Sequence, residues 1–133
     1  MLAGTSLPKR LAATPRMLSS LLEYAQASAA NLGLEIVETI WVAGSMEIPL
    51  ALDRLLASEE INGAACLSII EKGETGHGAA MGNAVIKTIL ELQLVHDKPI
   101  GLGIIGPGAE LHHIEARLEP HARASIEALT ALL

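Results

Sequence analysis

Residues 64–77 read AACLSIIEKGETGH, and this stretch decides the predicted fold. The run 64–70 is short, apolar and bounded on both sides by glycine-containing pairs, which is typical of a buried strand. Residues 79–95, which follow, have the apolar spacing of a helix. We therefore expect a strand, a glycine-bracketed turn and a helix in this order.

The turn at 73–77 combines two glycines with a histidine. A turn from a strand into a helix directs free backbone N–H groups, and the positive end of the helix dipole, toward one place, which makes a pocket for an anion. His77 would place a side chain that transfers protons near neutral pH beside that anion. A lone loop histidine is more often a partly exposed residue without a catalytic role, and this alternative stays open.

The composition restricts the class of protein. The chain has 133 residues, of which 50% are hydrophobic and 18% charged, and we expect a single folded domain over 1–133 with a real core. The net charge of -6 argues against nucleic-acid binding, and so do the single Trp, the single Tyr and the absence of Phe. The positive mean hydropathy of +0.42 predicts that subunits pack together.

The expected location is the cytoplasm. No apolar stretch has the length of a membrane span, and the first residues lack the pattern of a signal peptide. The one cysteine, Cys66, falls in the predicted core strand, where we expect a small buried hydrophobic side chain. A lone buried thiol fits a reducing compartment.

Predicted helices and strands alternate along the rest of the chain. Helices are expected at 14–31, 47–57, 109–118 and 121–132, and further strands at 34–42 and 99–105. Pro120 separates the last two helices. Residues 6–13 occupy the place of a first strand, and an edge strand, an arm on a neighbouring subunit and a disordered segment all remain open for them. The pattern predicts an α/β fold, a three-layer sandwich with a four-stranded, mainly parallel sheet flanked by helices.

In such folds, ligands collect at the carboxyl ends of the strands. Three glycine-bearing loops, 44–47, 73–77 and 106–108, are expected at this edge. Together they predict a site for a small molecule, although the last loop could also be only a turn that ends a strand.

Taken in order, these loops resemble those of the 6,7-dimethyl-8-ribityllumazine synthase family over about residues 32–132. The stretch 44–49, GSMEIP, matches that family's signature of a glycine, an acid, an aliphatic residue and a proline. Residues 73–77 match its phosphate loop and catalytic histidine, and Arg117 stands where the family has a phosphate-binding arginine. The resemblance is closest to the archaeal branch, because residues 97–108 have that branch's strand with a Gly-Pro-Gly ending.

The resemblance implies a flavodoxin-like fold and a transferase of riboflavin biosynthesis. The enzyme would condense 5-amino-6-(D-ribitylamino)uracil with 3,4-dihydroxy-2-butanone 4-phosphate, releasing phosphate and water, without a metal or an organic cofactor. The resemblance implies that His77 is catalytic. Substrate binding would fall to Ala13, Ser45, Met46, Glu47, Lys72, Gly73, Glu74, Thr75, Leu102 and Arg117. It also implies a homo-oligomer, either a pentamer or an icosahedral shell of pentamers, with active sites between neighbouring subunits.

The sequence departs from the family in the half of the site that binds the pyrimidine. The family's aromatic residue at the end of the first strand corresponds to Ala13, and the chain contains no Phe. Stacking of a base on an aromatic side chain contributes roughly 1–3 kcal/mol of binding free energy. Losing it would weaken pyrimidine binding about tenfold to a hundredfold. Two alternatives therefore stand beside the synthase. One is a protein of this fold that mainly assembles or binds a ligand, and the other is a different flavodoxin-like enzyme acting on a phosphorylated sugar.

Some candidate residues have structural alternatives. Arg117 could form an ion pair with Glu115 or Glu119 on a solvated helix, and Glu47 could favour the start of its helix through the dipole. The pair at 112–113, two adjacent histidines, suggests a metal. Adjacent helical residues point about 100° apart, however, so we expect that they share no ion.

Overall fold

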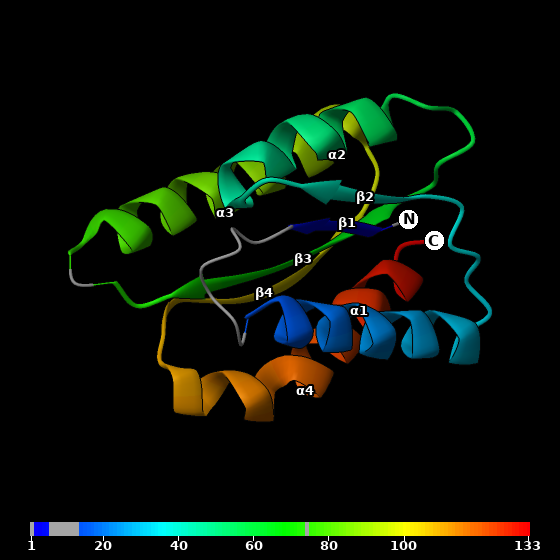
Figure 1. The fold of residues 1–133 in the computed structure, drawn as a ribbon. Helices are drawn as coiled ribbons and strands as arrows, with labels where there is room; N and C mark the ends of the chain where they lie inside the picture. Colours follow the sequence, from blue (N-terminus) through cyan, green and yellow to red (C-terminus); the bar gives the residue numbers. More distant parts are fainter. Residues whose placement is uncertain (1, 6–13, 74) are drawn as a thin grey trace.

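The computed structural model describes residues 2–5, 14–73 and 75–133 of the chain. Within these residues, four strands form a parallel sheet in the order β2-β1-β3-β4, with helices on both faces (Figure 1). The strands are β1 (Leu2–Thr5), β2 (Thr39–Val42), β3 (Ala64–Glu71) and β4 (Ile100–Ala109). The helices are α1 (Thr14–Asn31), the short 3-10 helix η1 (Ser45–Glu47), α2 (Ile48–Leu56), α3 (His77–His96) and α4 (Leu111–Thr130). The predicted α/β class, with helices packed on a parallel sheet, is confirmed.

Two hydrophobic cores fill the spaces between the layers. Helices α2 and α3 cover one face of the sheet, and α1 and α4 cover the other (Figure 1). Side chains of β3 alternate between the two cores, with Ala64 and Cys66 facing α2 and α3, and Ala65 and Leu67 facing α1 and α4. This burial on both faces explains why the sequence of β3 is continuously apolar. Among the described helices, none combines the length and the hydropathy needed to cross a membrane.

Two strands differ in position from the prediction. The first strand expected at 6–13 lies outside the described residues, and β1 is a segment that precedes it. The strand expected at 34–42 is shorter than predicted, because β2 begins only at Thr39. Thr39 is paired with Leu2, the first residue of β1. The described residues 34–38 pair with none of the described strands.

The end of β4 corrects a further prediction, because the Gly-Pro-Gly segment at 106–108 does not end the strand. Ile69 pairs with Ile105 and Glu71 pairs with Ala109, so β4 contains extra residues between these two pairs, as in a bulge. Pairing then resumes, since the Lys72 N–H donates to the Ala109 carbonyl oxygen at 2.9 Å. The bulge carries β4 beyond its predicted end at residue 105.

The two helices predicted on either side of Pro120 form the single helix α4. Proline lacks an N–H group and usually interrupts a helix. Here, Leu118 before it and Ala122 after it are both buried in the core shared with α1. Packing of this one face on both sides of the proline offsets the lost hydrogen bond, which is why the helix continues.

Helix α4 packs so closely on β4 that Gly101 has no room for a side chain. A Cβ atom at this position would overlap the backbone carbonyl of Ser125. We therefore expect Gly101→Ala to lower the free energy of unfolding by at least about 3 kcal/mol, measured by urea denaturation. Gly76→Ala is the matched control, because a Cβ there meets nothing within 4 Å, and it should change stability by less than about 1 kcal/mol. Equal stability of the two variants would contradict the packing.

Cys66 is fully buried in β3, as predicted, and its Sγ lies 3.6 Å from the Gly101 carbonyl oxygen. Burial disfavours the charged thiolate and raises the pKa of Cys66 from 9.0 to about 12. Only the thiolate attacks a disulfide reagent, so at pH 8 the native thiol should react at least about a hundredfold more slowly than the urea-unfolded thiol. Following the released chromophore by absorbance measures both rates. Similar rates in the two states would show that the thiol is accessible.

Candidate active site

The predicted glycine-bearing segments meet at one edge of the sheet. Because β2, β3 and β4 are parallel, the chain leaves all three at the same edge. Helix η1 follows β2, the loop 72–76 follows β3, and Glu110 connects β4 to α4. The bulge at 106–108 lies in the last part of β4 and so belongs to the same edge.

An open pocket of about 490 Å³, here called the loop pocket, lies between the loop after β3 and the start of α4. It is lined by Lys72, Gly73, Thr75, Gly76, Ala79, Gly108, Glu110 and His113. The structure thus brings together three predicted binding residues, Lys72, Gly73 and Thr75. Glu74, predicted with them, lies outside the described residues.

The start of α3 adds an anion-binding feature beside this pocket. Helix α3 begins at His77, and its N-cap residue, Gly76, has no side chain that could cap the first turn. Such a turn has N–H groups without partners inside the helix, and the dipole adds partial positive charge. The His77 N–H donates to Thr75 Oγ1 at 3.4 Å, and Ala79 of the same turn lines the pocket. This helix terminus can therefore hold an oxyanion.

The His77 side chain is exposed. The described residues that line the loop pocket include Gly76 and Ala79, which lie before and after His77 in the sequence, but not His77 itself. Within one chain, His77 therefore stands next to the pocket and is open to solvent. This exposure leaves the imidazole accessible to a substrate.

A second pocket, the helix pocket, lies between β4 and α4 and has a volume of about 240 Å³. It is lined by Ile105, Gly106, Pro107, Gly108, Ala109, His113, Arg117 and His121. His113, Arg117 and His121 recur at every fourth position and so share one face of α4. A guanidinium between two imidazoles suits an oxyanion, because its planar fork donates several hydrogen bonds. Sequence reasoning missed His113 and His121 as pocket residues, although their spacing from Arg117 was a signal.

Arg117 is not engaged in the ion pair considered as its alternative role. Its Nη1 donates to the His113 carbonyl oxygen at 3.2 Å. Glu119 instead pairs with Arg123 at 3.0 Å. Within the described part of the chain, no carboxylate pairs with Arg117, so its guanidinium remains available to a ligand.

Arg117 and the phosphate loop lie in different pockets of one chain. The two pockets share Gly108 and His113, so they adjoin, but Arg117 does not line the loop pocket among the residues described. The loop, the Arg117 guanidinium and the His77 imidazole therefore do not meet within one of these pockets.

Lys72 and Glu110 face each other in the loop pocket. Lys72 Nζ lies 3.6 Å from Glu110 Oε1, and both side chains are largely exposed. Exposed pairs of this kind contribute little to stability. Lys72 can therefore exchange the carboxylate for another anion at small cost.

The segment after β2 holds three predicted binding residues. Ser45 Oγ lies 2.7 Å from Ser68 Oγ, and Ser68 is fully buried in β3, so this bond ties η1 to the sheet. Met46 and Glu47 are exposed. Glu47 is the N-cap of α2 but makes no capping hydrogen bond through its side chain.

Leu102 is not among the described residues that line the loop pocket. Leu102 lies near the start of β4 and packs against the core between the sheet and helices α2 and α3. Ala13 lies outside the described residues. Their assignment to substrate binding stays a prediction.

Comparison with known proteins identifies the chain's relatives. The sequence model of the 6,7-dimethyl-8-ribityllumazine synthase family matches residues 14–133, a range that begins earlier than the resemblance over 32–132. The protein of that name from Staphylothermus marinus is 35% identical over 113 residues, which cover 85% of this chain and 75% of the relative. The protein of the same name from Picrophilus torridus is 34% identical, covering 85% and 82%. That from Methanopyrus kandleri is 36% identical, covering 84% and 78%.

Proposed function

The chain belongs to the 6,7-dimethyl-8-ribityllumazine synthase family, and on this premise we propose that it is a transferase of riboflavin biosynthesis. It condenses 5-amino-6-(D-ribitylamino)uracil with 3,4-dihydroxy-2-butanone 4-phosphate to 6,7-dimethyl-8-ribityllumazine. Inorganic phosphate and water leave. The observation that carries this proposal is the family match over residues 14–133, which includes the phosphate loop and the described part of the site. The reaction is one of primary metabolism, and we place the protein in the cytoplasm.

The phosphate group of the butanone substrate binds at the loop pocket. The backbone N–H groups of Gly73 and Thr75, together with the N-terminus of α3, favour an oxyanion. Lys72 adds a positive charge in this chain of net negative charge. The phosphate must later depart, and a site made of backbone donors and an exposed cation holds it without a covalent step.

His77 is the proton-transfer group. Forming the imine between the amine and the ketone, eliminating phosphate and closing the ring each move a proton to or from a reacting atom. An exposed imidazole at the start of α3, next to the phosphate site, can act as acid and as base near neutral pH. Holding two substrates together supplies a further share of the rate, because the reaction is bimolecular.

The complete site forms between two subunits of a homo-oligomer. Arg117 is not among the described residues that line the loop pocket of its own chain, and Arg117 of a neighbour would add a second cation beside Lys72. Apolar side chains on α3, Leu94 and Val95, are 80% and 76% exposed and would be covered by such an assembly. We propose a pentamer, or a multiple of pentamers, in which each subunit has the family's flavodoxin-like arrangement around a four-stranded sheet. Residues 1–133 form one domain of this assembly.

The pyrimidine half of the site favours a second candidate function. The chain has no Phe, and Ala13 stands at the position of the family's stacking aromatic. The one tryptophan, Trp41, is 46% exposed on β2, and Met46 on η1 is 58% exposed. Without an aromatic supplied from elsewhere, the protein would be an assembly-forming or ligand-binding member of the family with little synthase activity.

Mixing both substrates and following lumazine absorbance tests the function. The parent protein should form lumazine, and His77→Ala should reduce turnover by about 10²-fold, because it removes the general acid–base group. His96→Ala is the matched control, because His96 is the last residue of the same helix and pairs with Asp53 at 2.8 Å. It should retain the parent's turnover. An inactive parent that still forms pentamers would favour the assembly candidate, and an active His77→Ala variant would remove His77 from the mechanism.

Arg117→Ala should raise the KM for the phosphorylated substrate more than it lowers kcat, because it removes a phosphate contact.

Subunit exchange then tests where Arg117 acts. Oligomers reassembled from equal amounts of His77→Ala and Arg117→Ala subunits should recover activity, because some interfaces combine an intact His77 with an intact Arg117 from its neighbour. Separately assembled mixtures are the control. No recovery after exchange would place both side chains in the same subunit.

A further inference from the structure

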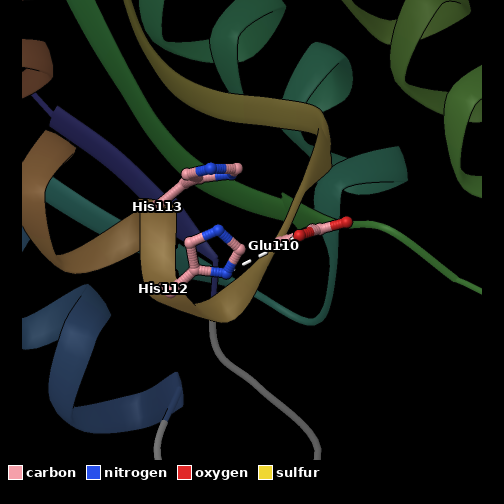
Figure 2. A group of neighbouring side chains, drawn as sticks. All are labelled: Glu110, His112 and His113. Carbon is pink, nitrogen blue, oxygen red and sulfur yellow. Dashed lines mark ion pairs between the residues drawn. The ribbon is translucent and has the colours of Figure 1, made fainter.

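Glu110, His112 and His113 lie together where β4 leads into α4 (Figure 2). Each offers one ligand atom, and these atoms all lie within 4.8 Å of one another. All three side chains are exposed, so an ion can reach them directly. We propose that they form a binding site for a divalent transition-metal ion of the zinc type. This proposal does not depend on the proposed reaction.

The argument from sequence against a shared ion leaves out part of the geometry at this position. It considered only the angle between adjacent helical residues, but His112 and His113 lie in the first turn of α4 and their ring centroids are 3.8 Å apart. Glu110 precedes the helix as its N-cap, with an extended backbone at φ -87° and ψ 151°. Because Glu110 does not follow the helical spacing, its carboxylate can lie beside the imidazoles.

The distances suit coordination. Ligand atoms about 2.0–2.1 Å from a tetrahedral zinc ion lie about 3.4 Å from one another. His112 Nδ1 and Glu110 Oε2 are already 3.6 Å apart. The third atom lies within 4.8 Å of both, so a small rotation of an exposed side chain completes the set. Water can occupy the remaining position of the ion.

The chemistry of the three ligands selects the class of metal. Two imidazole nitrogens and one carboxylate oxygen match the preference of Zn²⁺ and of neighbouring transition metals. Ca²⁺ and Mg²⁺ prefer shells made only of oxygen, so they should bind poorly here.

Lys72 lies beside the carboxylate of this site. Lys72 Nζ lies 3.6 Å from Glu110 Oε1, while the other oxygen, Oε2, faces His112. This exposed ion pair is weak, so the carboxylate can turn toward an ion shared with the imidazoles. Lys72 and the positive end of α4 both oppose a cation, so the negative charge of Glu110 is required as well as its oxygen.

Calorimetric titration of the full chain with Zn²⁺ tests the site. The parent should bind one Zn²⁺ per chain at this site, and His112→Ala, His113→Ala and Glu110→Gln should each weaken binding by at least about tenfold. Mg²⁺ should give no comparable heat. His96→Ala and His121→Ala are the matched controls, because they remove histidines outside the cluster, and they should bind Zn²⁺ as the parent does.

A zinc-soaked crystal gives an independent readout. An anomalous peak between Glu110, His112 and His113 would support the proposal. No binding by the parent, unchanged affinity in His113→Ala, equal losses in the control variants, or a peak at His77 instead would each overturn it.

Discussion

The close packing of α4 on β4 is the constraint on which the candidate site depends. A side chain at Gly101 would overlap the backbone of Ser125, so the helix can lie directly on the strand only because this position is glycine. The face of α4 that carries His113 then meets the last part of β4, where both pockets form. On the other face of the sheet, a Cβ at Gly82 would lie 2.9 Å from the Cβ of Pro107, so the same end of β4 also positions the start of α3. The end of β4 thus positions both α3, which bears His77, and α4, which bears Arg117.

Those parts of the fold that depend on local pattern could be predicted from the sequence. The helix at 14–31 has the predicted bounds, and the continuous apolar run of β3 identified a strand buried on both faces. The errors arose where a distant segment decides the outcome. Pro120 argued for two helices, but a core shared with α1 keeps α4 continuous. Residues 34–38 have the composition of a strand, yet they pair with none of the described strands.

The sequence indicates some of the residues that line the pockets, but not how these residues are arranged in space. Gly73, Thr75 and Gly76 of the motif at 73–77 line a pocket, and the spacing of His113, Arg117 and His121 could have shown that they share a face of α4. Sequence could not show that Arg117 and the phosphate loop line separate pockets, because this depends on the register of α4 along β4. The connection between β4 and α4 also brings Glu110 beside His112 and His113. A helical wheel of α4 begins at Leu111 and therefore does not include Glu110.

The loop pocket and the Glu110–His112–His113 cluster are physically coupled, because Glu110 and His113 belong to both. Lys72 Nζ lies 3.6 Å from Glu110 Oε1, and this exposed pair contributes too little to resist a competing ligand. An anion in the loop pocket would attract Lys72 away from Glu110. A cation on the cluster would attract the Glu110 carboxylate away from Lys72. Each ligand would thus pair with the side chain whose partner the other ligand has attracted. With the metal site as proposed, this pair of opposite charges would favour occupation by an oxyanion and a metal ion together over occupation by either alone.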